Sequence, residues 1–252
     1  MRNIPQKEKI IVALDVHSED KVFEIVKELN HSIDFFKVGK ELYVSEGPDI
    51  VKYLKNKGKK VFLDLKFYDI PNTVAKAAAS LVRMNIDLFT IHASGGKEMM
   101  KATVEAVQKE VAELKRQGKK VTAPKILAVT VLTSFSRDDL IEVGVNSHNE
   151  EWGLDVAVQV KRLALLAKEA GVDGVVASPL EIEMLREDLG EEMLIVTPGI
   201  RPASFQKLDD QKRVLTPKEA IDKGADYLVI GRPILSAYSP HEAATRIIKE
   251  IS

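Results

Sequence analysis

Short apolar runs recur along the whole chain and alternate with segments of helical periodicity. The runs are rich in β-branched and aromatic residues, which favours strands. Eight of them span residues 10–14, 35–38, 61–65, 88–91, 126–132, 174–177, 194–197 and 227–230. Between them apolar residues repeat at helical spacing, as at Val22, Ile25, Val26 and Leu29. This alternation of strand and helix predicts a sheet of parallel strands.

The ends of the predicted helices are marked by glycines. Gly58, Gly118, Gly171 and Gly224 each follow a helical pattern and come shortly before the next predicted strand. Eight strands with helical connections in 252 residues match an α/β protein of the (β/α)8 TIM barrel class, with residues 1–252 forming a single domain. A doubly wound open sheet is the main alternative, but it usually has fewer strands and often a glycine-rich first turn, which this sequence lacks.

Two predicted connections are longer than a simple joint requires. The first, residues 133–151, contains a short helical pattern at 138–143 and then polar residues. The second, residues 201–213, is polar throughout most of its length. Its composition fits a lid over a ligand site and a solvated loop equally well.

Composition narrows the range of partners. Hydrophobic residues make up 45% of the chain, enough for a full core, and the 30% of charged residues nearly cancel to a net charge of −1. Such a balance does not favour a nucleic-acid or membrane surface. The sequence has no cysteine and shows neither a signal peptide nor a run long enough to span a membrane. We therefore expect a cytoplasmic protein whose partner is a small molecule or another protein.

Polar side chains or glycines follow nearly every predicted strand. In chain order they are Asp15, Lys37, Asp64 with Lys66, His92, Thr133, Ser178, Gly199 with Arg201, and Gly231 with Arg232. One such residue alone indicates no more than a turn. In a closed barrel, however, the carboxyl ends of all strands meet at one mouth, where barrel enzymes have their active sites.

The third predicted strand carries unexpected charges. Asp64 and Lys66 are two residues apart and would project to the same face, and Asp69 follows the strand's end. An isolated pair of this kind is most often an ordinary ion pair. A Schiff-base lysine must lose its proton, whereas two neighbouring carboxylates favour the charged form. We therefore expect Lys66 to be a general acid for a developing carbanion, in an alternating array with Lys37, Asp64 and Asp69.

The last two strands are followed by segments suited to phosphate. Their sequences are Thr197-Pro198-Gly199-Ile200-Arg201 and Ile230-Gly231-Arg232-Pro233. Glycine allows backbone amides to approach an anion closely, and arginine offers a charged fork to its oxygens. A phosphate monoester is therefore the expected substrate. The five histidines show no spacing typical of metal ligands, so we expect no metal and no cofactor, and we expect His92 to be a hydrogen-bonded residue at a strand end.

One segment resembles the signature of a known family. Asp64-Leu65-Lys66-Phe67-Tyr68-Asp69-Ile70-Pro71-Asn72-Thr73 is similar to the signature of the orotidine 5′-phosphate decarboxylases. Further similar segments lie at residues 12–15, 36–39, 91–96, 131–134, 174–179, 197–201, 210–213 and 229–233. The Asp-x-Lys-x-x-Asp core is shared with sugar-phosphate decarboxylases and synthases of the same superfamily, whereas the longer string and Thr-Pro-Gly-Ile-Arg are more specific.

The resemblance implies a homodimeric, cofactor-free barrel that converts orotidine 5′-monophosphate to uridine 5′-monophosphate in de novo pyrimidine biosynthesis. It implies that Lys66 protonates the carbanion at C6, and that Asp64 lies near the departing carboxylate. It also implies binding roles. These are Asp15 and Lys37 for the ribose hydroxyls, Thr133 for the pyrimidine, Arg201, Gln211, Gly231 and Arg232 for the phosphate, and Asp69, Ile70 and Thr73 for the partner subunit's site.

Two alternatives stay open. The first is a related barrel enzyme acting on a pentulose or hexulose phosphate, such as a metal-dependent 3-keto-gulonate-phosphate decarboxylase or a hexulose-phosphate synthase. The second is a non-catalytic sensor that binds a nucleotide phosphate through the phosphate-binding residues of the barrel. The intact set of Asp64, Lys66 and Asp69 argues against the sensor.

Overall fold

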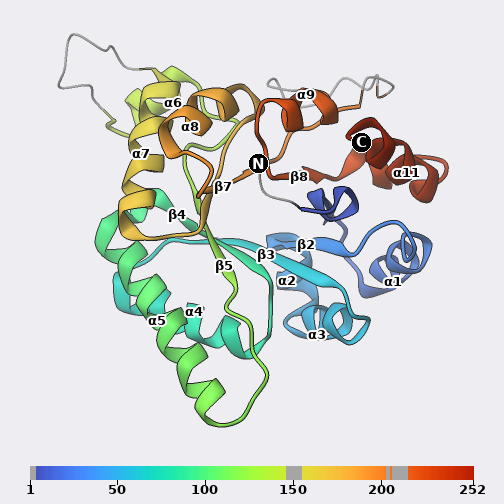
Figure 1. Cartoon of the computed structure of the whole chain (residues 1–252), viewed down its shortest axis with the longest axis horizontal. Helices are drawn as coiled ribbons and strands as arrows, with labels where there is room; N and C mark the ends of the chain where they lie inside the picture. The colour runs from blue at the N-terminus through green and yellow to red at the C-terminus, as the bar shows by residue number, and fades with distance from the viewer. Residues whose placement is uncertain (1–3, 146–154, 203–204, 206–214) are drawn as a thin grey trace.

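Eight parallel strands close into a barrel in chain order, with β8 paired to β1 (Figure 1). The computed structural model describes residues 4–145, 155–202, 205 and 215–252. The strands are β1 Ile10–Leu14, β2 Phe35–Gly39, β3 Lys60–Phe67, β4 Leu88–His92, β5 Lys125–Val129, β6 Gly174–Val176, β7 Leu194–Thr197 and β8 Tyr227–Ile230. The predicted (β/α)8 barrel is confirmed, and the doubly wound alternative is wrong because the sheet has no free edge.

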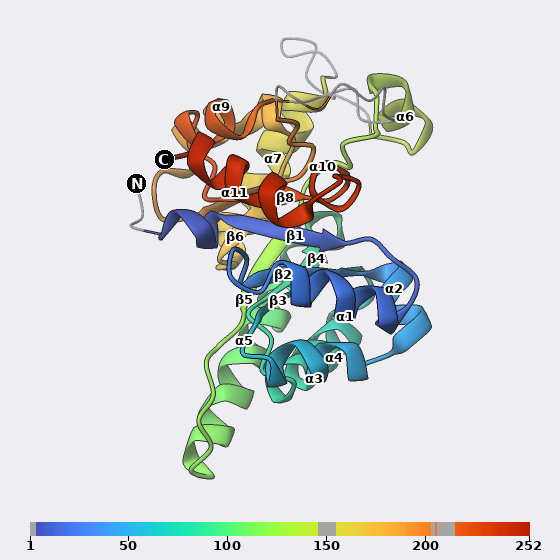
Figure 2. The same ribbon diagram turned by 90° about the vertical axis from the view of Figure 1, so that its right-hand side faces the viewer.

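Helices surround this barrel. They are α1 Glu19–Glu28, α2 Lys40–Glu46, α3 Asp49–Asn56, α4 Pro71–Arg83, α5 Gly96–Arg116, α6 Arg137–Glu142, α7 Val156–Ala170, α8 Ile182–Leu189, α9 Pro217–Asp222, α10 Arg232–Leu235 and α11 Pro240–Glu250, with 3-10 turns η1 Gln6–Lys9, η2 Ala93–Gly95 and η3 Pro179–Glu181. The end of α5 projects beyond the barrel in both views (Figure 2). None of the described helices has the length and apolarity needed to cross a membrane.

Local sequence signals account for several helix boundaries. Pro71 stands at the first position of α4, where its missing N–H costs nothing. Gly171 ends α7 in the left-handed conformation with φ +81°. The other three predicted glycine stops, at 58, 118 and 224, also have positive φ. The short helix predicted at 138–143 is α6, whereas most of the polar 201–213 segment lies outside the described residues.

The apolar side chains form two cores separated by the strands. Alternate strand residues such as Val12 and Phe36 face the surrounding helices, while Ile11, Phe35 and Phe62 fill the barrel interior. The interior residues are almost fully buried. Because the interior is packed with apolar side chains, polar chemistry is confined to the barrel's ends.

Two strands differ from the sequence prediction. The fifth strand was expected to reach residue 132, but β5 ends at Val129 because its neighbour β6 pairs only as far as Val176. Beyond that point the Thr130 hydroxyl donates to the Val176 carbonyl at 3.1 Å. The third strand extends further than expected, to Phe67, and it contains a bulge.

The bulge in β3 surrounds Lys66. Leu63 lies opposite Phe89 and Phe67 opposite Ile91, so β3 advances by four residues while β4 advances by two. Lys66 has φ +54°, a left-handed conformation that costs a non-glycine residue about 1–2 kcal/mol. The regular alternation predicted through this segment is therefore broken at Lys66.

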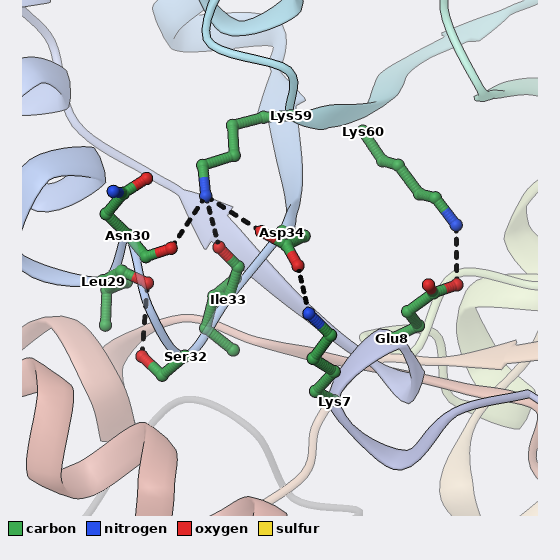
Figure 3. A network of polar contacts seen from close by, with 9 residues as sticks. All are labelled: Lys7, Glu8, Leu29, Asn30, Ser32, Ile33, Asp34, Lys59 and Lys60. Carbon is green, nitrogen blue, oxygen red and sulfur yellow. Dashed lines mark hydrogen bonds and ion pairs between the residues drawn. The ribbon is translucent and has the colours of Figure 1, made fainter.

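The amino end of the barrel carries a charged network between η1, β2 and β3 (Figure 3). The Lys59 ammonium donates to the carbonyl oxygens of Asn30 and Ile33 at 3.1 and 3.0 Å and to Asp34 Oδ1 at 3.0 Å. Lys7 donates to the other oxygen of Asp34 at 2.7 Å. These bonds fix the loop that enters β2 against the start of β3.

An aspartate precedes each even-numbered strand at this end. Asp34, Asp87, Asp173 and Asp226 stand directly before β2, β4, β6 and β8. Each is ion-paired with a lysine or arginine, and the last three also accept a backbone N–H from the preceding strand at 2.8–2.9 Å. These carboxylates brace neighbouring strands where the chain enters the barrel.

Candidate active site

Four side chains of alternating charge form a continuous array at the carboxyl ends of β1, β2 and β3. Lys37 Nζ lies 3.0 Å from Asp15 Oδ1 and 3.8 Å from Asp64 Oδ2. Lys66 Nζ donates to both oxygens of Asp64 at 2.8 and 2.9 Å. The structure thus brings together Asp15, Lys37, Asp64 and Lys66. Their chemical roles stay predictions.

Thr90 on β4 joins this array, and the sequence analysis did not single it out. Its side chain is fully buried. Its Oγ1 lies 3.0 Å from Asp64 Oδ1 and accepts the backbone N–H of Lys66 at 2.9 Å. The sequence signal that could have identified Thr90 is its hydroxyl between the apolar Phe89 and Ile91. These residues belong to the strand that follows the strand of Asp64 in the predicted barrel.

The ionisation of Asp64 follows from its neighbours. Burial alone would raise the pKa of the carboxyl, because the charged form loses hydration. The positive charges of Lys66 and Lys37, with hydrogen bonds from Lys66 and Thr90, outweigh burial and hold the pKa of Asp64 below its ordinary value. Asp64 is therefore an anion at neutral pH, flanked by two ammonium groups.

His92 stands at the end of β4 beside this array. Burial, followed by the positive charges of Lys66 and Lys40, lowers the pKa of the imidazole, so His92 is neutral at pH 7. Its Nδ1 is buried without a hydrogen-bond partner in the described part of the chain. The expectation of a hydrogen-bonded residue is thus wrong for this atom, and the ring instead packs against Tyr68 with centroids 5.8 Å apart.

Asp69 does not complete the array within one chain. Among the described residues no ion pair joins it to Lys66. Its Oδ1 instead accepts the N–H of Ile70 at 2.6 Å. The expectation that Lys66 lies between two carboxylates of its own subunit is therefore wrong. The bulge in β3 is followed by a segment whose side chains point outward, and Asp69, Ile70 and Thr73 are all exposed.

The residues expected to bind phosphate lie after β7 and β8. Gly231 immediately precedes α10, whose first residue is Arg232. A Cβ on Gly231 would come within 3.3 Å of Asp15 Oδ2, so this position has little space for a side chain. Arg201 follows a backbone bridge between Ile200 and Leu215, and its guanidinium lies 5.6 Å from the Phe205 ring centre. Gln211 lies outside the described residues.

A cavity of about 190 Å³ opens beside the charged array. Lys37, Asp64, Lys66, Thr133 and Pro198 line it together with apolar side chains from the barrel. The cavity therefore combines ammonium and carboxylate groups with a largely apolar wall. Within the described ranges, no group of three His, Asp or Glu side chains is placed to hold a metal ion.

Comparisons with known proteins agree with this geometry. The model of the orotidine 5′-phosphate decarboxylase / HUMPS family matches residues 8–247. The orotidine 5′-phosphate decarboxylase of Geotalea daltonii is 51% identical over 243 residues, which cover 96% of this chain and 95% of that protein. The one from Moorella thermoacetica is also 51% identical, over 97% of this chain and 92% of its own.

Solved structures give the same result. The crystal structure of orotidine 5′-phosphate decarboxylase from Lactobacillus acidophilus superimposes with a TM-score of 0.80 at 40% identity, covering 97% of this chain and 99% of that one. Family model, relatives and solved structure each extend over nearly the whole barrel. This chain therefore belongs to the orotidine 5′-phosphate decarboxylase / HUMPS family.

Proposed function

We propose that this protein decarboxylates orotidine 5′-monophosphate to uridine 5′-monophosphate and CO2 without a cofactor, with Lys66 as the proton donor. The observation that carries the proposal is the Lys66 ammonium held by both oxygens of Asp64 at the wall of the cavity. A lysine ammonium paired with a carboxylate at the wall of a cavity is suited to deliver a proton to a carbanion. The substrates named for its relatives supply such a carbon.

The reaction balances without an external oxidant or reductant. The bond between C6 of the pyrimidine and its carboxylate breaks, CO2 leaves, and the electron pair remains on C6. Lys66 then transfers one ammonium proton to C6, and the neutral amine regains a proton from water. Because the positive charge of Lys66 lies beside the carbon that becomes negative, it also stabilises the transition state electrostatically.

The remaining array residues are proposed to hold the nucleotide. Asp15 is exposed at the mouth of the barrel and is bonded to Lys37, so the pair offers an acceptor and donors to the ribose hydroxyls. Thr133 lines the cavity and is proposed to contact the pyrimidine. The phosphate is assigned to Arg201, Gly231 and Arg232, and to Gln211 outside the described residues. Anchoring the phosphate far from C6 supplies binding energy that holds the ring in place.

The direct test is the ultraviolet absorbance of orotidine 5′-monophosphate during incubation with the purified protein, with and without a chelator. The proposal predicts equal conversion to uridine 5′-monophosphate in both samples. Activity that the chelator abolishes would favour the metal-dependent alternative acting on a sugar phosphate. An unchanged absorbance, with nucleotide binding shown by calorimetry, would favour the non-catalytic sensor.

We further propose that the active unit is a homodimer whose two sites are shared between subunits. In one chain Asp69, Ile70 and Thr73 are exposed, and Asp69 accepts the backbone N–H of Ile70 and makes no ion pair with Lys66 among the described residues. An exposed apolar side chain such as Ile70, at 66% accessibility, is suited to a protein surface contact. In the proposed dimer these residues enter the partner's site and supply the carboxylate missing next to its Lys66.

Hybrid dimers test the shared site. Asp69→Ala and Lys66→Ala each inactivate both sites of their own homodimer in this proposal. A mixed dimer keeps one intact site, with Lys66 from one subunit and Asp69 from the other. Mixing the two inactive variants should therefore restore activity, up to about one quarter of the wild-type value after random exchange. Absence of recovery in samples where mass spectrometry shows mixed dimers would contradict the sharing.

A further inference from the structure

We propose that Thr90 is a positioning residue: its hydroxyl holds the backbone of Lys66 and the carboxylate of Asp64 in the geometry from which Lys66 delivers its proton. The inference rests on the proposed function of Lys66. It concerns a residue of β4 that does not line the cavity and that makes both of its hydrogen bonds inside the protein.

The direction of the two hydrogen bonds is fixed by chemistry. The Lys66 backbone N–H has only a donor to offer, so the Thr90 oxygen is the acceptor at 2.9 Å. The single hydroxyl hydrogen of Thr90 is then available for Asp64 Oδ1 at 3.0 Å. Because the Thr90 side chain is fully buried, its hydroxyl has no access to solvent as an alternative partner.

The bulge explains why Lys66 needs this acceptor. Between the pairs Leu63–Phe89 and Phe67–Ile91, β3 has two residues more than β4, so the N–H of Lys66 is removed from the regular ladder. A buried N–H without an acceptor is costly, and the left-handed backbone at φ +54° is itself unfavourable for lysine. The Thr90 hydroxyl replaces the missing ladder acceptor and stabilises that conformation.

The four hydrogen bonds close a ring of contacts. Thr90 is bonded to the backbone of Lys66 and to the carboxylate of Asp64, and the same carboxylate receives the Lys66 ammonium at 2.8 and 2.9 Å. Both ends of the Lys66 side chain are thereby fixed relative to one hydroxyl. Loss of this hydroxyl releases the backbone of Lys66 and removes one hydrogen bond from Asp64. A displacement of about 1 Å at a catalytic group can lower a rate by about a hundredfold.

Three threonine variants test the proposal in the decarboxylation assay. Thr90→Val removes the hydroxyl with little change in volume, and Thr90→Ser keeps a hydroxyl. The matched control is Thr103→Val, since Thr103 is equally buried but donates to the Met99 carbonyl within α5, at 2.8 Å. We expect Thr90→Val to lower kcat about ten- to a hundredfold with KM within about twofold. Thr90→Ser should recover most of kcat, and Thr103→Val should keep the wild-type kcat.

The KM comparison separates positioning from a general structural effect. A loss of kcat of equal size in Thr103→Val, a rise in KM without loss of kcat, or a Thr90→Ser as slow as Thr90→Val would each overturn the proposal. If Thr90→Val does not fold, Thr90→Ala against Thr90→Ser gives the same comparison. Lys66→Ala is measured in parallel. Activity retained by Lys66→Ala would overturn the proposed function, whereas an inactive Lys66→Ala beside a fully active Thr90→Val would overturn this inference alone.

Discussion

Each end of the barrel contains a lysine whose ammonium is bonded to an aspartate, but the two lysines differ in their exposure and in their other hydrogen-bond partners. At the amino end, Lys59 is 4% exposed and donates to two backbone carbonyls and to Asp34 (Figure 3). An ammonium has three hydrogens, so its donor capacity is filled by the protein. At the carboxyl end, the Lys66 side chain is 27% exposed and lines a cavity, and its ammonium donates only to Asp64 among the described residues.

Lys59 therefore carries a charge that stabilises the fold, whereas the charge of Lys66 is accessible to a ligand. A carboxylate partner is common to both lysines and does not distinguish them. The difference lies in the other partners and in access. The Lys59 ammonium is bonded to backbone carbonyls, and Lys59 does not line the cavity at the barrel mouth. Lys66 lines that cavity, and its backbone has an unfavourable left-handed conformation.

The largest effect is expected for Lys66→Ala. Removing the proposed proton donor should lower kcat by about a thousandfold or more, since general acid catalysis typically contributes 10²–10⁴-fold. Uridine 5′-monophosphate should still bind, because the proposed ribose and phosphate contacts remain. Steady-state kinetics and calorimetry of nucleotide binding measure the two effects. Loss of nucleotide binding as large as the loss of kcat would show that Lys66 is chiefly a binding residue.

The second prediction concerns binding within the carboxyl end. Arg232→Ala should raise KM about ten- to a hundredfold with a smaller change in kcat, because a charged hydrogen bond to phosphate contributes about 1.5–3 kcal/mol. The matched control is Arg246→Ala, an exposed arginine of α11 paired with Glu242. The control should leave KM unchanged. A loss of kcat in Arg232→Ala as large as that in Lys66→Ala would contradict the assignment of phosphate binding to Arg232 and of proton transfer to Lys66.

At the amino end, Lys59→Met should act on stability alone. The variant leaves two carbonyls and one oxygen of Asp34 without their donor, which should lower the free energy of unfolding by about 1–3 kcal/mol. Lys52→Met is the control, since Lys52 is exposed and forms an exposed ion pair with Asp49 on the same helix. Denaturant titration measures the stability, and the absorbance assay should give an unchanged kcat. A decrease in kcat of tenfold or more in folded Lys59→Met would break the comparison between the ends.

The smallest expected effect is the dependence of stability on pH. Hydrogen bonds from Lys7 and Lys59, together with their charges, lower the pKa of Asp34 against the opposing effect of burial. A carboxylate with a lowered pKa stabilises the folded state above its unfolded pKa of about 4, and that contribution is lost as pH falls through the folded pKa. The stability difference between wild type and Asp34→Asn should therefore shrink below pH 4. A stability difference between wild type and Asp34→Asn that increases toward low pH would contradict a lowered pKa of Asp34.

Much of the architecture follows from the sequence because periodicity and glycine stops are local signals. The eight strands were predicted in this way, and the structure confirms them. Their carboxyl ends were predicted to share one mouth, where Lys37, Asp64 and Lys66 form the expected contacts, but Asp15 and not Asp69 is the fourth member of the array within one chain. The bulge at Lys66 was not predictable, since it depends on a register between β3 and β4 that no local pattern fixes.

Two site features needed three-dimensional information for a different reason. Thr90 lies 24 residues after Lys66 and meets it only across neighbouring strands. Asp69 is close to Lys66 in sequence, yet its carboxylate accepts the N–H of Ile70, and the contact with Lys66 predicted from proximity along the chain is absent among the described residues of a single subunit.

The central claim, that the Lys66 ammonium protonates the substrate carbon, can be tested by chemical rescue because the chain has no cysteine. In Lys66→Cys the new thiol is the only one, and treatment with 2-bromoethylamine converts it to an aminoethyl thioether that restores an ammonium near the original position. Iodoacetamide, which adds a neutral group, is the control. We predict an inactive Lys66→Cys variant, a return of kcat after aminoethylation and none after the neutral alkylation. Equal kcat values in the aminoethylated and neutrally alkylated samples would contradict the claim.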